Sequence, residues 1–162
     1  MAGAPPVREV PARPATMVHM RIYLPATLGA LTKALAEGGF RGAPYTAYAV
    51  TPALRARHGT DDEEELEYAA MEAAAEESLR LLGAAPDEPA RRVVVAAEVP
   101  DAVVRAADSA DSPAAVLVEA EVPLKRVASA HVDDETAAPD IAAGRAEDHE
   151  LLWYATQELR YL

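Results

Sequence analysis

Apolar and polar positions alternate most regularly near the start of the chain, over residues 18–24. The apolar positions are Val18, Met20, Ile22 and Leu24. A period of two predicts a strand with one buried face, and Pro25 is expected to end it. Further short apolar runs predict strands at 45–50, 93–97, 115–118 and 127–132. The run over 93–97 is continuous, which is typical of a central strand covered on both faces.

Three other segments have helical spacing. Thr27 is the expected N-cap of a first helix that ends at Gly38-Gly39. Thr60 and Glu63 fit a capping box that opens a long helix to about Leu82. Its expected apolar face consists of Tyr68, Met71, Ala75, Leu79 and Leu82. A final helix is expected from Glu147 to the end, with Leu151, Leu152, Ala155, Leu159 and Leu162 on one side.

This order of elements predicts an α+β domain with an about five-stranded, mixed or antiparallel sheet packed by two or three helices. The links after residue 91 are too short for full crossover helices, which argues against a doubly wound parallel sheet. Residues 1–19 contain four prolines and no periodic pattern, so they are expected to form a disordered Pro/Ala-rich leader. Residues 20–162 are expected to form a single domain, and Met20 is a candidate alternative start of translation.

Composition excludes several classes of function. The chain carries a formal net charge of -12, which argues against a broad nucleic-acid-binding surface because phosphate contacts need Lys and Arg. It contains no cysteine, which excludes disulfides, thiolate metal sites and a cysteine nucleophile. No apolar run approaches the ~18 residues of a transmembrane helix. Walker A, G-x-G-x-x-G and G-x-S-x-G motifs are absent, so no cofactor is predicted.

The acidic residues are concentrated in two fields. Residues 61–77 contain nine acids and no base, and residues 133–150 contain seven acids. A docking surface for a basic protein partner is one interpretation, and a solvated helix face is the other. The interface candidates are Glu63, Glu64, Glu65, Glu67, Trp153 and Tyr154. Trp153 is the only tryptophan, and its place beside Tyr154 suits either a core anchor or an interface hot spot.

Two further groups of side chains carry chemistry. On the polar face of the first strand, His19, Arg21 and Tyr23 point the same way and with Tyr48 would line a pocket suited to phosphate or carboxylate. The alternative is a wet sheet face. A metal site of His and carboxylate ligands is the second hypothesis. Its candidate ligands are His131, Asp133, Asp134, Asp148 and His149. The alternative for His149 is a helix-surface residue stacked on Trp153.

Several stretches together resemble a family of small uncharacterised proteins from high-GC actinobacteria, labelled as a domain of unknown function. They include Met20 to Leu28, Ala49 to Leu54, Arg91 to Asp101, Val122 to Asp134 and Glu147 to Leu159. The resemblance covers nearly all of 20–162 and implies a cytoplasmic bacterial protein. The layout of Arg21, Tyr48 and Val122 to Val127 also resembles ADP-ribosyltransferase-like domains, although no catalytic glutamate motif follows.

Two hypotheses of function follow. The first is a non-enzymatic, acidic, cytoplasmic protein that acts through protein–protein contacts. The second is an ADP-ribosyltransferase-like or nucleotide-binding domain with a pocket around Arg21 and Tyr48. The sequence leaves open whether the protein is an enzyme.

Overall fold

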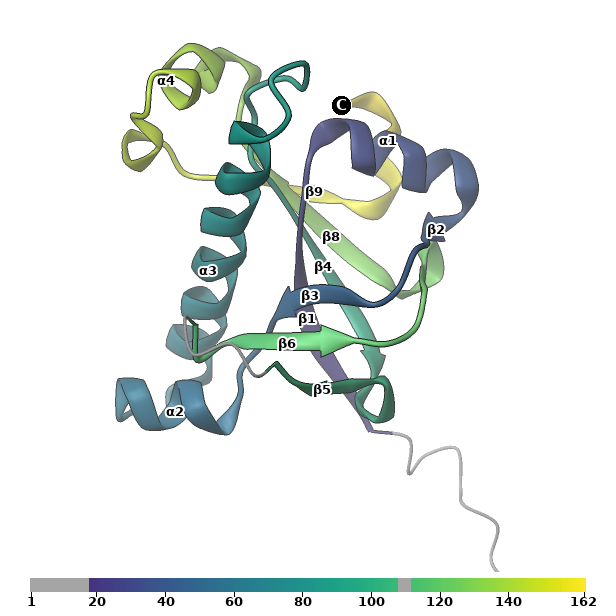
Figure 1. Cartoon of the computed structure of the whole chain (residues 1–162), viewed down its shortest axis with the longest axis vertical. Coiled ribbons are helices and arrows are strands. Elements are labelled where there is room, and N and C mark those ends of the chain that lie inside the picture. Colours follow the sequence, from purple (N-terminus) through teal and green to yellow (C-terminus); the bar gives the residue numbers. More distant parts are fainter. Residues whose placement is uncertain (1–17, 108–111) are drawn as a thin grey trace, which may run out of the picture.

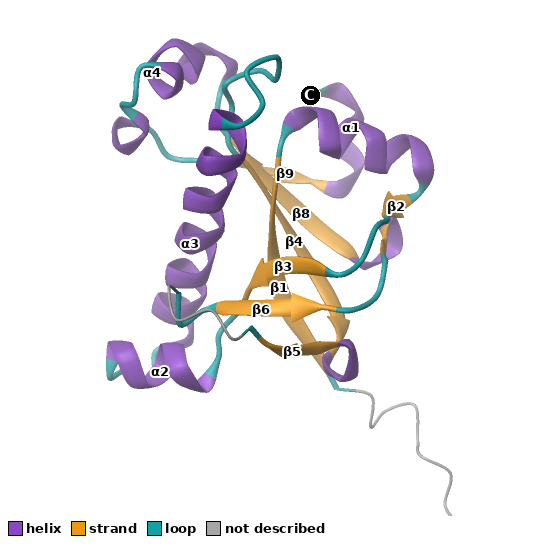
Figure 2. Cartoon of the chain, viewed as in Figure 1, coloured by secondary structure: helices purple, strands orange, loops and turns teal. Residues whose placement is uncertain are grey.

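The computed structural model describes residues 18–107 and 112–162, and a seven-stranded sheet forms the centre of this part of the chain (Figures 1 and 2). The strand order is β5-β6-β3-β1-β4-β8-β9, and each neighbouring pair is antiparallel. These strands are β1 (His19–Ala26), β3 (Tyr45–Tyr48), β4 (Val93–Pro100), β5 (Val104–Ala106), β6 (Ala115–Val118), β8 (Val127–Val132) and β9 (Leu152–Ala155). A second, two-stranded sheet pairs β2 (Gly39–Phe40) with β7 (Val122–Pro123).

Helices cover both faces of the large sheet. The α-helices of the described residues are α1 (Leu28–Glu37), α2 (Pro52–His58), α3 (Glu63–Gly83) and α4 (Ala138–Ala142). Short 3₁₀ helices span Asp101–Val103, Leu124–Arg126, Glu135–Ala137, Ala146–Asp148 and Thr156–Tyr161. None of the helices in the described residues has both the length and the apolar character needed to cross a bilayer.

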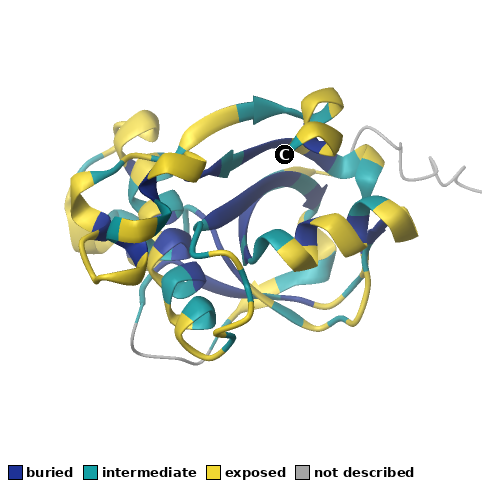
Figure 3. Ribbon diagram, turned by 90° about the horizontal axis from the view of Figure 1, so that it is seen from above, coloured by how far each residue is buried: buried dark blue, intermediate teal, exposed yellow. Residues whose placement is uncertain are grey.

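The two faces of the sheet have separate apolar clusters, because neighbouring residues of a strand point to opposite sides. On one face, Ile22, Leu24 and Val95 pack with Leu31 of α1 and with Leu159. On the other face, Tyr23, Val94 and Ala96 pack with Leu66, Ala70 and Ala74 of α3. Figure 1 shows α3 and α1 on opposite sides of the strands, and Figure 3 shows buried residues concentrated in those strands. The α+β class and the antiparallel pairing are therefore confirmed.

The expected number of about five strands was wrong, because four further strands are present. β2 and β7 have two residues each and β5 has three, which is too short to show a period-two pattern. β9 has four residues, and its segment has helical spacing. β5 and β9 lie at the two edges of the sheet.

The first strand continues past Pro25 to Ala26, which the sequence analysis did not expect. Pro25 lies opposite Val94 of β4, whereas the pairing of β1 with β3 is confined to Tyr23 and Tyr48. Among the described residues, the side of β1 away from β4 therefore has no strand beside Pro25. A proline is tolerated there, since its missing N–H would have no ladder partner.

The predicted C-terminal helix was also wrong. The segment from Glu147 forms a 3₁₀ turn, strand β9 and a second 3₁₀ helix, Thr156–Tyr161. β9 pairs with the backbone groups of β8 on the side away from β4, with Trp153 opposite His131 and Tyr154 opposite Ala130. Strand pairing and the β preference of aromatic residues outweigh a helical spacing of leucines.

The long acidic helix exists, but its cap and its sheet-facing side differ from the prediction. Asp62, and not Thr60, is the N-cap of α3. The buried side consists of Leu66, Ala70, Ala74, Ala75 and Ser78. The small alanines allow the helix to lie close to the sheet. Tyr68, expected in the core, is 53% exposed.

The predicted leader falls almost wholly outside the described residues, which begin at Val18. His19 is already the first residue of β1. One sheet includes both β1 and β9. The single domain over 20–162 remains a prediction.

Candidate functional site

Helix α3 has a second stripe of residues beside the ones that cover the sheet. Tyr68, Met71, Glu72 and Ala75 follow the i, i+3, i+4, i+7 spacing and lie on one side of the helix. Tyr68, Met71 and Ala75 belong to the apolar face expected from the sequence. Ala75 is buried and Met71 packs against the cluster under α3, whereas Tyr68 is 53% exposed, and all four border a depression of the surface.

The depression lies between α3 and the segment 146–151, which leads into β9. One hollow of about 170 Å³ is bordered by the α3 stripe and by Arg92, His149, Glu150 and Leu151. A second hollow of about 470 Å³ shares Glu72, Ala75 and Arg92 with the first. It is also bordered by His58, Ala69, Ala73, Glu76, Leu79, Ala146 and Glu147. Because they share residues, we treat the two hollows as one feature, the α3–β9 groove.

Acidic side chains from both fields of the sequence meet at this groove. Glu72 and Glu76 come from the first field, and Glu147 and Glu150 come from the second. Apolar side chains, including Met71 and Leu151, border the same groove, and Arg92 lines both of its hollows. The groove therefore combines acidic and apolar side chains at its rim, which neither field shows by itself.

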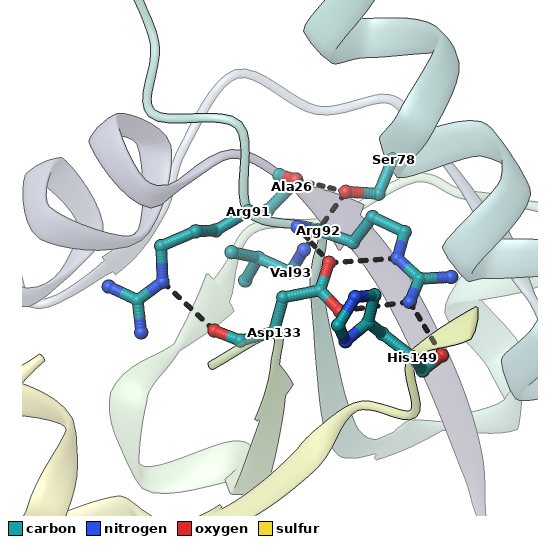
Figure 4. Close-up of polar contacts among 7 residues, drawn as sticks. All are labelled: Ala26, Ser78, Arg91, Arg92, Val93, Asp133 and His149. Atoms are coloured by element: carbon teal, nitrogen blue, oxygen red, sulfur yellow. Dashed lines mark hydrogen bonds and ion pairs between the residues drawn. The ribbon is translucent and has the colours of Figure 1, made fainter. Parts of the chain in front are cut away.

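Arg92 forms the base of the groove and is fixed by a buried ion pair (Figure 4). Its Nε and Nη2 lie 2.8 Å from Oδ2 and Oδ1 of Asp133, which is 0% exposed. Arg92 Nη2 also donates to the carbonyl oxygen of His149 at 3.0 Å. This bidentate geometry neutralises the Arg92 charge and ties the segment before β9 to the sheet.

A buried serine attaches the other wall. Ser78 Oγ of α3 donates to the carbonyl oxygen of Ala26 at 2.7 Å and accepts from the N–H of Val93 at 2.9 Å. Helix α3 is thereby joined to β1 and β4 at the end where Arg92 precedes β4 (Figure 4). Both walls of the groove are thus held to the same end of the sheet.

Asp140 holds the loop that carries His149. Its carboxylate binds Nε2 of His149 at 2.8 Å and Nη2 of Arg145 at 2.5 Å. The bond from His149, followed by that from Arg145, lowers the pKa of Asp140. Together with the Arg92 bond, this contact positions His149 from two sides.

β9 ends the sheet next to the groove and exposes large apolar side chains. Trp153 is 61% exposed, and Leu152 is 43% exposed. Trp153 and Leu151 are two residues apart, so they lie on the α3 side of the sheet, where Leu151 packs against the α3 cluster. Tyr68, which is 53% exposed, lines the groove from α3. Exposed large apolar side chains such as Trp153 and Tyr68 on one face are a feature of interaction surfaces.

A polar strip continues from the groove across the same face of the sheet. Tyr23 Oη donates to Oε1 of Glu67 at 2.7 Å, and Arg21 pairs with Glu98. His131 lies near Arg21, and burial together with the Arg21 charge lowers its pKa. Burial and the bond to Glu67 raise the pKa of Tyr23. The strip therefore pairs Arg21 with an acid and keeps His131 in its neutral form near pH 7.

The structure brings only some of the predicted pocket residues together. Arg21 and Tyr23 lie side by side in this strip, whereas the Nε2 atom of His19 lies 2.7 Å from Nη1 of Arg126. Tyr48 lies opposite Tyr23 and is buried under α3, which raises its pKa. The guanidinium of Arg21 is engaged by Glu98. A pocket around Arg21 and Tyr48 remains a prediction.

The candidate metal ligands have other partners. Asp133 binds Arg92, Asp134 caps the turn at Thr136, and His149 binds Asp140. His131 lies in the polar strip and Asp148 is exposed. Within residues 18–107 and 112–162, no three His, Asp or Glu side chains are grouped so as to hold a metal ion.

The interface candidates of the first field lie at the start of α3. Glu63 pairs with Arg55 of α2, and the backbone N–H groups of Glu64 and Glu65 donate to Asp62. Glu67 is turned towards Tyr23. Tyr154 is half-buried and packs against the α1-side core, unlike its neighbour Trp153.

Sequence reasoning missed Arg92, Glu72 and Glu150 as groove residues. One signal was available for Arg92: it directly precedes the strand at 93–97, and Asp133 directly follows the strand at 127–132. If the two strands pair antiparallel, these residues face each other. The rim acids gave no such signal, since their meeting depends on the path from α4 to β9.

Comparison with known families gives one match. Residues 20–162 match the model of DUF6912, described as a family of unknown function. No curated protein and no solved structure matches the chain.

Proposed function

Because the chain belongs to the DUF6912 family, whose function is unknown, we propose from the geometry that it is a protein-docking module. The α3–β9 groove binds a basic segment of a partner protein. In this proposal the protein acts by binding and not by covalent chemistry.

The observation that carries the proposal is the convergence of the two acidic fields on one groove that also has apolar lining. Glu72 and Glu76 line it from α3, and Glu147 and Glu150 line it from the segment before β9, together with the apolar side chains of Met71, Ala75 and Leu151. Lys and Arg have apolar stems and charged tips. A segment that carries them can place the stems on the apolar lining and the charges beside the acids.

Trp153 supports the same assignment. A tryptophan that served as a core anchor would be buried, whereas this side chain is 61% exposed on an edge strand. Trp is enriched among residues that dominate binding energy at protein interfaces. The aromatic face also attracts a cation placed above it.

A peptide selection tests the proposal. We expect peptides selected from a random displayed library on the wild-type chain to be rich in Lys or Arg and in apolar residues. Their affinity should fall about tenfold or more for the Glu72→Lys/Glu150→Lys variant, because two rim attractions become repulsions.

The matched control is Asp101→Lys/Glu121→Lys, which makes the same change of net charge outside the groove. Both of these side chains are exposed. Its affinity for the selected peptides should stay within about twofold of wild type. Equal losses in the two variants would show that binding follows net charge alone, and the proposed groove would be wrong.

A further inference from the structure

We infer that the partner segment binds as an extended strand that pairs with the open edge of β9 and carries an apolar–basic–apolar pattern. The inference rests on the proposed function and adds the mode of binding and the sequence class of the partner. It follows from the hydrogen-bond phase of the sheet and from the side-chain faces of β9.

The hydrogen-bond phase is set at the paired ends of β4 and β8. The N–H of Asp133 donates to the carbonyl oxygen of Arg92 at 3.1 Å, and the N–H of Arg92 donates to Oδ2 of Asp133 at 2.8 Å, so the backbone groups of these two residues face each other. Such pairs alternate along an antiparallel ladder. Two residues earlier, His131 directs its backbone groups to β4, and Ala130 and Val132 direct theirs to β9.

On β9, the partners of Ala130 and Val132 are Tyr154 and Leu152. These residues are bonded to β8, so Trp153 directs its N–H and carbonyl oxygen away from β8, to the open edge. The C-terminal end of the strand agrees with this phase. Ala155, two residues on, donates its N–H to Oε1 of Glu158 at 2.8 Å and not to β8.

The edge is therefore closed at Ala155 by Glu158 and open at Trp153. Edge strands are commonly protected by side chains or short length, because their open groups attract other strands. Here Glu158 protects the edge at Ala155 but not at Trp153, whose side chain is exposed. A partner residue opposite Trp153 would form both of its backbone hydrogen bonds with that residue.

The side-chain faces give the sequence pattern. A residue opposite Trp153 points to the α3 side, beside the indole ring and the end of the groove where Glu150 lies. A Lys or Arg there is favoured by the ring and by the acidic rim. Its two neighbours point to the other face, beside Leu152 and Tyr154, where apolar residues are favoured.

Charge complementarity identifies the occupant as a basic segment of another protein. A second copy of this chain is disfavoured, since pairing two β9 edges would bring two acidic rims together on chains of net charge -12. The pairing would be a case of strand addition to a sheet edge.

The test uses capped seven-residue peptides that alternate valine and lysine. In the paired strand, lysine N–H groups face β9 and valine N–H groups face solvent. Methylation of the backbone nitrogen of each lysine removes the N–H donors to β9 and keeps the side-chain charge. Methylation of the backbone nitrogen of each valine is the matched control. Binding is followed by Trp153 fluorescence, and pairing by hydrogen exchange of the Trp153 amide.

We expect the unmethylated and valine-methylated peptides to bind and to slow exchange of the Trp153 amide at least tenfold. The lysine-methylated peptide should lose at least tenfold in affinity. Equal binding of all three peptides without slower exchange would overturn strand pairing and leave groove docking in place. Failure of the unmethylated peptide, while library-selected peptides still bind the groove, would also overturn strand pairing alone.

Discussion

The two faces of the sheet are built from the same strands and serve different ends. On the α1 side, Ile22, Leu24 and Val95 meet helix α1 and the C-terminal 3₁₀ helix in an apolar core. On the α3 side, the alternate residues include Arg21 and Tyr23, and the helix covers only part of the strands. The first face stabilises the fold, and the second leaves a polar strip and a groove.

The difference shows how a small domain can support a binding surface. The α3 face is held by an apolar cluster around Leu66 and, at one end, by a few specific polar contacts. Ser78 fixes α3 to β1 and β4, and Arg92 with Asp133 fixes the segment before β9. Breaking such contacts should therefore affect stability and the groove together, whereas changes at its rim should affect binding alone.

Removal of Asp133 should have the largest effect. Asp133→Ala leaves Arg92 buried without its counter-charge, and we expect a loss of about 3–5 kcal/mol in the free energy of unfolding, measured by urea denaturation. The double variant Arg92→Met/Asp133→Leu removes both charges and should recover most of this loss. A loss below about 1 kcal/mol for Asp133→Ala would show that the pair does not hold this end of the sheet.

The next effect separates the two stripes of α3. Leu66→Ala removes a fully buried side chain under the sheet and should cost about 2–5 kcal/mol. Tyr68→Ala, two residues on, should cost less than about 1 kcal/mol and weaken peptide binding. Thermal and urea unfolding with the same selected peptide measure both quantities. Equal destabilisation would mean that Tyr68 belongs to the core after all.

A smaller effect is expected within the polar strip. Tyr23→Phe removes the bond from Tyr23 to Glu67, and we expect a loss of about 0.5–1.5 kcal/mol in the free energy of unfolding. Tyr161→Phe is the control, because that side chain is 81% exposed and should show no change. If both variants were equally stable, the Tyr23–Glu67 hydrogen bond would not contribute to holding β1 and α3 together.

The smallest effect concerns pH. Burial and the Arg21 charge lower the pKa of His131, so its unfolded form binds a proton at a pH where the folded form does not. The free energy of unfolding should therefore decrease as pH falls below about 6.5, down to the lowered pKa of the folded state. His131→Gln should make this part of the pH profile flatter. An unchanged profile would contradict burial of His131.

The sequence predicts the long central elements because their patterns are local. Alternation in β1 and the continuous run in β4 are visible without any partner. β9 is invisible, since four residues rich in leucine and aromatics fit a helix as well as a strand until the edge of β8 is considered. Pairing with β8 is a tertiary interaction, and it overrides local spacing.

The candidate site shows the same division. Both acidic fields were visible in the sequence, whereas Trp153 fitted a core anchor as well as an interface residue, and the sequence favoured the core anchor. That Glu72 and Glu150 border one groove depends on the turn at α4 and on the Arg92–Asp133 pair, which no local pattern contains. The apolar face through Tyr68 was recognised, but its spacing did not indicate that Tyr68 borders a groove.

The most direct test of the account is chemical-shift mapping of the ¹⁵N-labelled chain with the alternating valine–lysine peptide. We expect the largest backbone shifts at the groove and β9, at Tyr68, Met71, Glu72, Leu151 and Trp153. Residues of the α1 side, such as Leu31, should not shift. Shifts centred on α1, or spread over all acidic surfaces in proportion to charge, would contradict it.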